Sequence, residues 1–357
     1  MPPLSAAPAF RALAARVRPV ERKVGDAVRA YLDTLTKPPG SLGDLEALAV
    51  QLGEITGRAK PEVSPPACIV FAADHGVAAE GVSAFGQDVT AQMVANFAAG
   101  GAAINAFAAQ INARLEVVNV GVAGDVEAPG VVNARVRRGT ASMLRGPAMS
   151  REAAAASLNV GVDAAERALD AGCRCLIVGD MGIANTTAAS AVLAVLSGQP
   201  AARLVGTGTG IDQAKLAHKI SVIERAIEAR PTDAGSPLDV LASVGGLEIG
   251  AMAGAYIAGA ARGVPCVVDG FIATVAALLA DRLCPEVRGY LIFGHRSAEP
   301  GHEVALEVLH AEPLLALGMR LGEGTGAALA FPLLKAACAM LAEMATFGDA
   351  GVDDTRS

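Results

Sequence analysis

Short apolar runs separated by longer helical patterns dominate the middle of this chain. From about Ala67, runs rich in Val, Ile and Leu recur, and each ends at a small or polar residue before a helical pattern begins. Continuous apolar strands that alternate with helices are typical of a parallel sheet buried on both faces. The pattern therefore predicts an α/β fold with a mostly parallel, Rossmann-like sheet of six strands. The six runs are CIVFAADHG from Cys68, LEVVNVGV from Leu115, CLIVGDMG from Cys175, RLVGTGTG from Arg203, PCVVDG from Pro265 and GYLIFGH from Gly289.

Helical patterns without such runs occupy both ends of the chain. Pro19 breaks the first of them, and a long alanine-rich pattern follows Gly324 near the other end. We expect the helices of the two ends to form one small helical domain that holds the stretch around Glu323 over the strand ends. The expected parts are N-terminal helices (1–66), a large α/β domain (67–300) and C-terminal helices that carry the stretch around Glu323 (301–357).

Polar and glycine-rich residues follow the six runs. In parallel α/β sheets, ligands bind beyond the carboxyl ends of the strands, so residues just after each run are candidates for a site. They are Asp74 and His75, Asn119, Asp180, Gly206 to Gly210, Asp269, and His295.

One carboxylate has an unusual local setting. Glu323 lies between Gly322 and Gly324 in LGMRLGEGTGAALA, Leu317–Ala330. The glycines allow backbone angles closed to other residues, and Thr325 is a candidate N-cap for the following helix. Glu323 could be a capping residue, a solvated turn residue or a base at the rim of a pocket. A helix N-terminus would lower its pKa and burial would raise it, and the sequence leaves the balance open.

Composition narrows the function classes. The chain has 357 residues, 52% hydrophobic and 3% aromatic, with a formal net charge of −7 and no basic run, so nucleic acid is not an expected partner. No apolar run approaches the roughly 20 residues of a membrane span, and we expect a cytoplasmic protein with no membrane partner. The six scattered cysteines fit buried small side chains in a reducing compartment better than disulfides.

Two glycine-rich loops could hold an anion. GTGTGID (Gly206–Asp212) is expected to link a strand to a helix, as is GDMGIANTTAAS (Gly179–Ser190). Exposed backbone amides at a helix start favour phosphate, although GTGTGID alone could be a tight turn. Lys215 and Lys219 lie beyond the first loop and could add charge, with at least one of them a solvated lysine.

The segment after the first run mixes apolar and hydrogen-bonding groups. Ser83, Phe85, Gln87, Gln92 and Met93 suit the lining of a site for a flat, mostly apolar heterocycle. For Asp74 and His75 we favour structural roles. The histidines lack HExxH or comparable metal spacing, and there is no GxSxG elbow or recognisable nucleophilic cysteine. A carboxylate acid or base, anion-binding loops and an apolar pocket remain, which points to group transfer or hydrolysis at a phosphorylated sugar.

The chain resembles one family over about Thr36 to Met344, the nicotinate-nucleotide–dimethylbenzimidazole phosphoribosyltransferases of cobalamin biosynthesis. The resemblance implies transfer of the phosphoribosyl group of nicotinate mononucleotide to 5,6-dimethylbenzimidazole, giving α-ribazole 5′-phosphate and nicotinate. It implies a homodimer, with no cofactor and no metal. The motifs that carry it are TKPPGSLGDLE, AADHGVAAEGVS, VTAQMVANFAAGGAAI, GDMGIANTT, SVGGLEIGAMAG, GVPCVVDGFI, HRSAEPGH and LGMRLGEGTGAALA.

The resemblance also implies roles for individual residues. Glu323 matches the family's general base, which acts with inversion at the anomeric carbon, and Asp180 stands where some members have a catalytic Glu. The expected nucleotide- and phosphate-binding residues are Gly182, Asn185, Thr186, Gly206, Gly208, Gly210, Lys219 and Ser297. The expected base-binding residues are Ser83, Phe85, Gln92, Met93 and Leu321; Phe85 and Met93 replace Ser and Gln of some members, which suggests a more apolar pocket.

Two other functions stay open from the sequence. A nucleotide N-glycosidic hydrolase would use water in place of the heterocycle. The third hypothesis is a non-catalytic nucleotide-binding protein of the same fold, and the intact Glu323 loop and both glycine loops argue against it.

Overall fold

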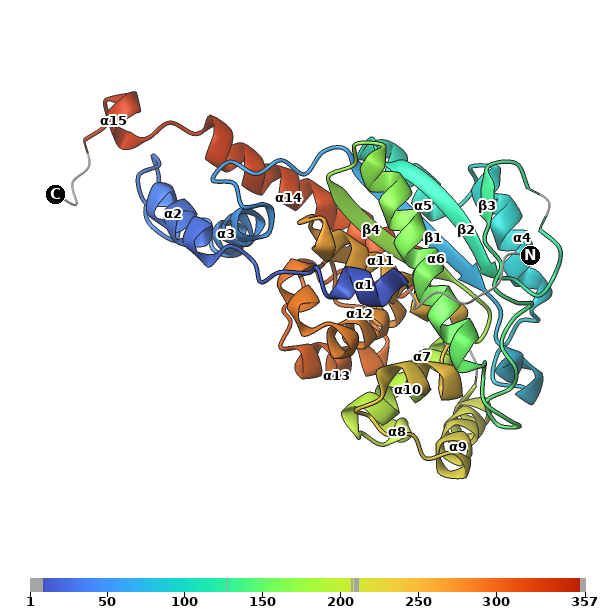
Figure 1. Cartoon of the computed structure of the whole chain (residues 1–357). Coiled ribbons are helices and arrows are strands. Elements are labelled where there is room, and N and C mark those ends of the chain that lie inside the picture. The colour runs from blue at the N-terminus through green and yellow to red at the C-terminus, as the bar shows by residue number, and fades with distance from the viewer. Residues whose placement is uncertain (1–8, 127, 207, 209–211, 354–357) are drawn as a thin grey trace.

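The computed structural model describes residues 9–126, 128–206, 208 and 212–353, and within them the centre is one sheet of six parallel strands (Figure 1). The strand order is β3-β2-β1-β4-β5-β6. The prediction of a parallel α/β fold is confirmed. Because the order reverses between β1 and β4, the crevice beyond these two strands is where such sheets bind ligands. The strands are β1 (Pro66–Ala73), β2 (Arg114–Gly121), β3 (Val131–Asn133), β4 (Cys175–Met181), β5 (Cys266–Val268) and β6 (Leu291–Phe293).

Five of the six apolar runs are strands, but the prediction for RLVGTGTG is wrong. Its first residues end a short helix, Ala201–Leu204, and continue as a loop. Leu204 and Val205 are buried against helices, so they have the apolar signature of a strand without being one. The sixth strand is β3, an edge strand of three half-exposed residues, which is too short and too exposed to give an apolar run.

Helices connect the strands and extend from both ends of the sheet domain. They are α1 (Ala9–Ala14), α2 (Arg22–Leu32), α3 (Asp44–Thr56), η1 (Gly76–Glu80), α4 (Asp88–Ala98), α5 (Ala103–Gln110), α6 (Arg151–Asp170), α7 (Asn185–Ser197), α8 (Ala201–Leu204), α9 (Gln213–Ala229), α10 (Pro237–Val244), α11 (Leu247–Ala261), α12 (Phe271–Leu283), η2 (Pro285–Tyr290), α13 (Pro300–Leu309), α14 (Thr325–Glu343) and α15 (Phe347–Ala350).

Two helical layers cover the sheet. Helices α6, α11 and α12 pack together on one face, and α4, α5 and α14 pack on the other. The α6–α11 contact is the most extensive in the molecule, and glycines allow it. A Cβ on Gly161 of α6 would collide with the Ala251 carbonyl oxygen, and one on Gly254 of α11 would collide with the Leu158 carbonyl oxygen. The high glycine and alanine content therefore serves close helix packing.

Replacing Gly161 by alanine is expected to lower the midpoint of thermal unfolding. The added methyl group meets backbone that cannot rotate away, and overpacking of this kind costs about 1–3 kcal/mol, more than the gain of about 0.5–1 kcal/mol in helix propensity. Gly348→Ala is the matched control, because a Cβ there meets only an ordinary contact in a helix. An unfolding midpoint for Gly161→Ala at or above the wild-type value would contradict this account of the packing.

The segment after α2 meets the segment after α14 at the far end of α14. Leu35 bridges Thr346, and the backbone N–H of Thr36 donates to the carbonyl of Ala345. Helix α14 begins at the strand ends and runs back along the sheet to α3, toward the two helical ends of the chain (Figure 1). The loop of Glu323 lies at the sheet end of α14, whereas α2, α3 and α15 lie toward its other end, and α1 packs on α11 and α6 (Figure 1). The division into a small helical domain and a large α/β domain stays a prediction from the sequence.

Helix α14 also corrects the reading of the sequence for membrane spans. Among the described helices it is the one long and apolar enough to cross a membrane by length and composition. Yet 61% of its most apolar 18-residue window is buried inside the protein, as in core helices that pack on a sheet.

Candidate active site

A cavity of about 240 Å³ lies beyond the carboxyl ends of the strands. Asp180 near the end of β4 lines it, together with the loop that leads into α7 and with residues that follow β5 and β6. This is the crevice next to the β1/β4 reversal. Nine of the residues expected to form the site line this cavity: Ser83, Asp180, Gly182, Asn185, Thr186, Gly208, Lys219, Ser297 and Leu321.

The Glu323 loop has a strained backbone. Gly322, Glu323 and Gly324 have φ values of +87°, +62° and +85°. Such angles are open to glycine but cost a residue with a Cβ about 1–3 kcal/mol, so they persist only when neighbouring structure enforces them. The loop sits directly on β4: the N–H of Glu323 donates to the carbonyl of Asp180 (3.3 Å), and a Cβ on Gly179 would collide with the Glu323 carbonyl.

The helix after this loop starts differently from the expectation. The N-cap of α14 is Gly324, and Thr325 is its first helical residue. The Thr325 hydroxyl donates to the carbonyl of Gly322 (2.7 Å) instead of accepting from the helix. The expectation that Thr325 is the N-cap is therefore wrong, because the strained turn ends one residue earlier.

The Glu323 carboxyl group is buried, with 5% of the residue exposed. Among the described residues its Oε2 has no hydrogen-bond partner. Burial raises the pKa of Glu323; a hydrogen bond from the backbone of Ile104 at the start of α5 lowers it by less, and Asp269 raises it further. The net pKa is above the usual value for glutamate, so burial outweighs the helix N-terminus. A raised pKa and an oxygen free to accept a proton suit a general base.

Asp180 lies beside Glu323 and has a hydrogen-bond partner of its own. Its Oδ2 accepts a hydrogen bond from Asn185 Nδ2 (2.8 Å). Burial raises the pKa of Asp180 well above its usual value, and the nearby carboxyl groups of Asp269, Glu248 and Glu323 add to this rise. The neutral acid is thereby favoured. Two neighbouring carboxyl groups with different environments can divide acid and base roles.

A buried cation closes the other side of the cavity. Lys219 on α9 is 1% exposed, and its Nζ donates to Thr186 Oγ1 (2.8 Å) and the Gly206 carbonyl (3.4 Å). Burial lowers the pKa of Lys219 to about 8, although Glu299 opposes this. An ammonium group has three donors, so one remains for a ligand such as phosphate. Lys215 is exposed, the solvated member of the pair.

The loop beside Lys219 follows helix α8, not a strand, so the expected strand–loop–helix unit is absent there. Gly206 and Gly208 nevertheless lie close to Lys219. Gly210, the third glycine assigned to the phosphate, lies outside the described residues.

The residues expected to bind the base are less well gathered. Ser83 and Leu321 line the cavity, whereas Phe85, Gln92 and Met93 are not part of its lining. Phe85 is 53% exposed. Asp74 and His75, by contrast, have protein partners: Asp74 accepts from Thr90 Oγ1 (2.6 Å) and the Ala123 N–H (2.8 Å), and His75 pairs with Glu248 (2.8 Å).

Comparison with known proteins identifies the family of this chain. The phosphoribosyltransferase family model covers residues 17–352. The curated nicotinate-nucleotide–dimethylbenzimidazole phosphoribosyltransferase of Chloroflexus aggregans is 52% identical over 95% of this chain and 97% of its own length. The protein of the same name from Azotobacter vinelandii is 55% identical over 90% of this chain and 92% of its own length. The chain belongs to this phosphoribosyltransferase family.

The solved structures agree with the family assignment. The crystal structure of the nicotinate-nucleotide–dimethylbenzimidazole phosphoribosyltransferase from Thermus thermophilus has a TM-score of 0.89 and 49% identity, over 93% of this chain and 99% of its own. The chain is therefore an enzyme of the glycosyltransferase class, a phosphoribosyltransferase with the α/β fold predicted from its apolar runs.

In this phosphoribosyltransferase, sequence reasoning missed Arg320. The residue lines the cavity, and its Nη1 donates to the Gly208 carbonyl (2.9 Å), which ties the Glu323 stretch to the loop of Gly206 and Gly208. Its place three residues before Glu323 in the same glycine-rich stretch was the available signal. His295 and Glu299 also line the cavity. His295 follows the sixth apolar run and Glu299 lies in the HRSAEPGH motif, but neither was assigned a role from the sequence.

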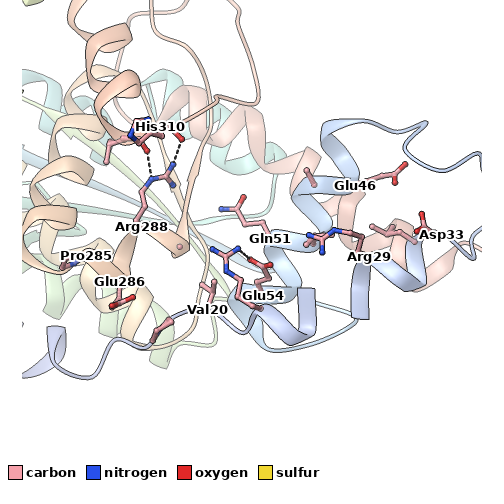
Figure 2. A pocket seen from close by; sticks show the side chains of 17 residues that line it. Val20, Arg29, Asp33, Glu46, Gln51, Glu54, Pro285, Glu286, Arg288 and His310 are labelled. Atoms are coloured by element: carbon pink, nitrogen blue, oxygen red, sulfur yellow. Dashed lines mark hydrogen bonds and ion pairs between the residues drawn. The ribbon is translucent and has the colours of Figure 1, made fainter. Parts of the chain in front are cut away.

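A larger hollow of about 890 Å³ lies elsewhere, between α2, α3 and the segment from η2 to the end of α13 (Figure 2). Arg22 pairs there with Glu54 (2.8 Å), and Arg288 donates to the carbonyls of Leu309 and His310. It is remote from the strand ends, so we do not assign the chemistry to it. Within the described residues there is no group of His, Cys, Asp and Glu side chains that could hold a metal, and all six cysteines are free.

Proposed function

We propose that this enzyme transfers the phosphoribosyl group of nicotinate mononucleotide to 5,6-dimethylbenzimidazole, giving α-ribazole 5′-phosphate and nicotinate. The names of its relatives supply the substrates. The observation that carries the mechanism is the buried Glu323 carboxyl group, with one oxygen lacking a partner among the described residues. Glu323 is not itself part of the cavity lining, but its neighbour Gly322 and the adjacent Asp180 are.

The chemistry needs one base and little else. One benzimidazole nitrogen attacks the anomeric carbon from the face opposite nicotinate, so the configuration inverts. The bond from that carbon to the pyridinium nitrogen breaks, and its electron pair neutralises the pyridinium. Nicotinate therefore leaves without a metal or an acid. The other benzimidazole nitrogen becomes acidic, and its proton passes to the Glu323 carboxylate, a contribution of about 10²–10⁴-fold to the rate.

The other side chains are proposed to bind and orient. Lys219, Thr186 and Gly208 would hold the 5′-phosphate, with help from Gly206 and Ser297, and Gly210 is proposed from the sequence to bind it as well. Gly182, Asn185 and neutral Asp180 would contact the ribose or the reacting centre. Ser83, Phe85, Gln92, Met93 and Leu321 would surround the base as it enters. We further propose a homodimer, which analytical ultracentrifugation can test.

Incubation with nicotinate mononucleotide, with and without dimethylbenzimidazole, tests the reaction. We expect release of nicotinate only when the base is present, together with a new ribotide on chromatography. Its anomeric proton signal in the NMR spectrum is expected to show the α configuration. Nicotinate release without the base would instead indicate hydrolysis, and a β-configured product would contradict inversion. No turnover under either condition would contradict the proposed reaction as a whole.

A further inference from the structure

The strained backbone around Glu323 needs hydrogen-bond partners from other parts of the fold. Three successive left-handed residues, Gly322 to Gly324, lead directly into α14. The N-cap residue of this helix is Gly324, which has no side chain to accept hydrogen bonds from the first turn. The first backbone N–H groups of any helix lack partners within the helix, and they are costly to bury unsatisfied. Because the start of α14 is buried, those donors need acceptors from elsewhere in the fold.

Asp269, which follows β5, supplies these acceptors. It is 0% exposed. Its Oδ2 accepts from the N–H of Gly324 (3.1 Å), and its Oδ1 accepts from the N–H of Ala327 (2.9 Å). Each carboxylate oxygen thus binds one donor of the turn immediately after Glu323. Asp269 is a helix cap contributed by a neighbouring strand, 55 and 58 residues away in sequence.

The surroundings leave this cap no freedom to shift. His295, after β6, lies with Nε2 3.5 Å from Asp269 Oδ1. A Cβ on Gly326 would collide with the His295 ring, and one on Gly294 would lie 2.9 Å from the Ala327 Cα. On the other side, Gly179 of β4 touches the backbone of Glu323 and Gly324. The loop packs between the ends of β4, β5 and β6, and the Asp269 carboxylate accepts hydrogen bonds from the turn that follows Glu323.

We propose that Asp269 is a positioning residue for the reaction: through the N–H groups of Gly324 and Ala327 it fixes the strained loop that aims the Glu323 carboxyl group. The assignment rests on the proposed role of Glu323 as the base. Both carboxylate oxygens of Asp269 are used by the backbone of this turn, so its effect on the rate passes through Glu323.

The charge of Asp269 gives the proposal a second consequence. The titratable groups around Glu323 are Asp180 on β4, Asp269 after β5 and His295 after β6, with Glu248 of α11 acting on Asp180. The Asp269 carboxylate raises the pKa of Glu323, after the larger effect of burial. Removing that charge should lower the pKa of Glu323. The rate would then fall at lower pH than in the wild type. Exposure of Glu323 in a loosened loop would lower its pKa in the same direction, so this pH shift is interpreted together with amide exchange over residues 322–327.

A double-mutant cycle with Glu323→Gln tests the coupling. Asp269→Asn keeps the shape but turns an N–H donor toward one of the two backbone N–H groups, and we expect kcat about tenfold lower, with KM for nicotinate mononucleotide within about twofold. In the Glu323→Gln background the same change should cost nothing more, because the base is already gone. Two results would overturn the proposal. One is a kcat of the double mutant that is lower than that of Glu323→Gln by the full factor seen for Asp269→Asn alone. The other is a fall of the rate at low pH in Asp269→Asn that occurs at the same pH as in the wild type.

Amide hydrogen exchange separates this proposal from the proposed function. Asp269→Asn and Asp269→Ala should both speed exchange over residues 322–327 while the central strands stay protected. Ser150→Ala is the matched control: it removes the hydrogen bond that caps α6 at Ala153 (3.2 Å), and it should leave both kcat and exchange at 322–327 unchanged. If Glu323→Gln proves fully active, the base assignment fails whatever the exchange shows. If exchange over 322–327 is unchanged in Asp269→Asn, the positioning role fails whatever the base.

Discussion

Replacing Glu323 by glutamine is expected to lower kcat about 10²–10⁴-fold, the usual contribution of a positioned base. Glutamine keeps the length and shape of the side chain, so the strained loop and the hydrogen bond from the Glu323 N–H to Asp180 should persist. What is lost is the oxygen that can take a proton, the Oε2 without a partner among the described residues. The affinity for nicotinate mononucleotide, measured by titration calorimetry, should stay close to the wild-type value.

The pH dependence gives a second measurement of the same role. A base must be ionised, and burial raises the pKa of Glu323 above its usual value. The wild-type kcat should therefore fall as the pH drops through that raised pKa, at a higher pH than an exposed glutamate would give. Glu323→Gln should lack this limb in its residual rate. Glu312→Gln, which removes a carboxylate with 93% of its side chain exposed, is the control and should match the wild type. A Glu323→Gln enzyme with a normal rate would remove Glu323 as the base.

The sheet was predictable because its strands are buried on both faces. Five runs of Val, Ile and Leu gave five strands, and the strand-end rule pointed to Asp180, Asp269 and His295, which lie around one site. Reading apolar runs as strands failed where the length and burial of a segment did not distinguish a strand from a buried helix end or loop. Leu204 and Val205 are as apolar as a strand, whereas β3 is short and half-exposed.

The site was predictable in its residues more than in its contacts. Glycines on both sides of Glu323 carried a local signal, since only special backbone angles require them, and the angles are indeed left-handed. The partners of the loop carried none. Asp269 reaches Gly324 and Ala327 across 55 and 58 residues, and the Ile104 N–H comes from a helix that sequence reasoning did not connect with Glu323. Contacts between residues so far apart in the sequence form only when the sheet assembles and brings the strand ends together.

Replacing Lys219 by methionine is expected to lower kcat/KM about ten- to a hundredfold through a higher KM. Hydrogen bonds to a charged group are worth about 1.5–3 kcal/mol, and methionine keeps the apolar stem while it removes the ammonium. Lys219 is buried and already oriented by Thr186 and Gly206, so little ordering is needed when phosphate binds. A substrate without the 5′-phosphate, nicotinate riboside, should not distinguish the two enzymes. Equal loss with both substrates would contradict a phosphate-binding role.

Arginine at the same position separates charge from shape through the pH profile. The pKa of Lys219 is lowered to about 8 by burial, so the free enzyme loses this positive charge as the pH rises through about 8. The wild-type kcat/KM should therefore fall above that pH, since kcat/KM reports the groups of the free enzyme. An arginine stays charged over this range, so Lys219→Arg should lose the alkaline limb even if its rate is lower throughout. A limb near pH 8 that survives in Lys219→Arg would assign it to another group and leave Lys219 without a titrating role in phosphate binding.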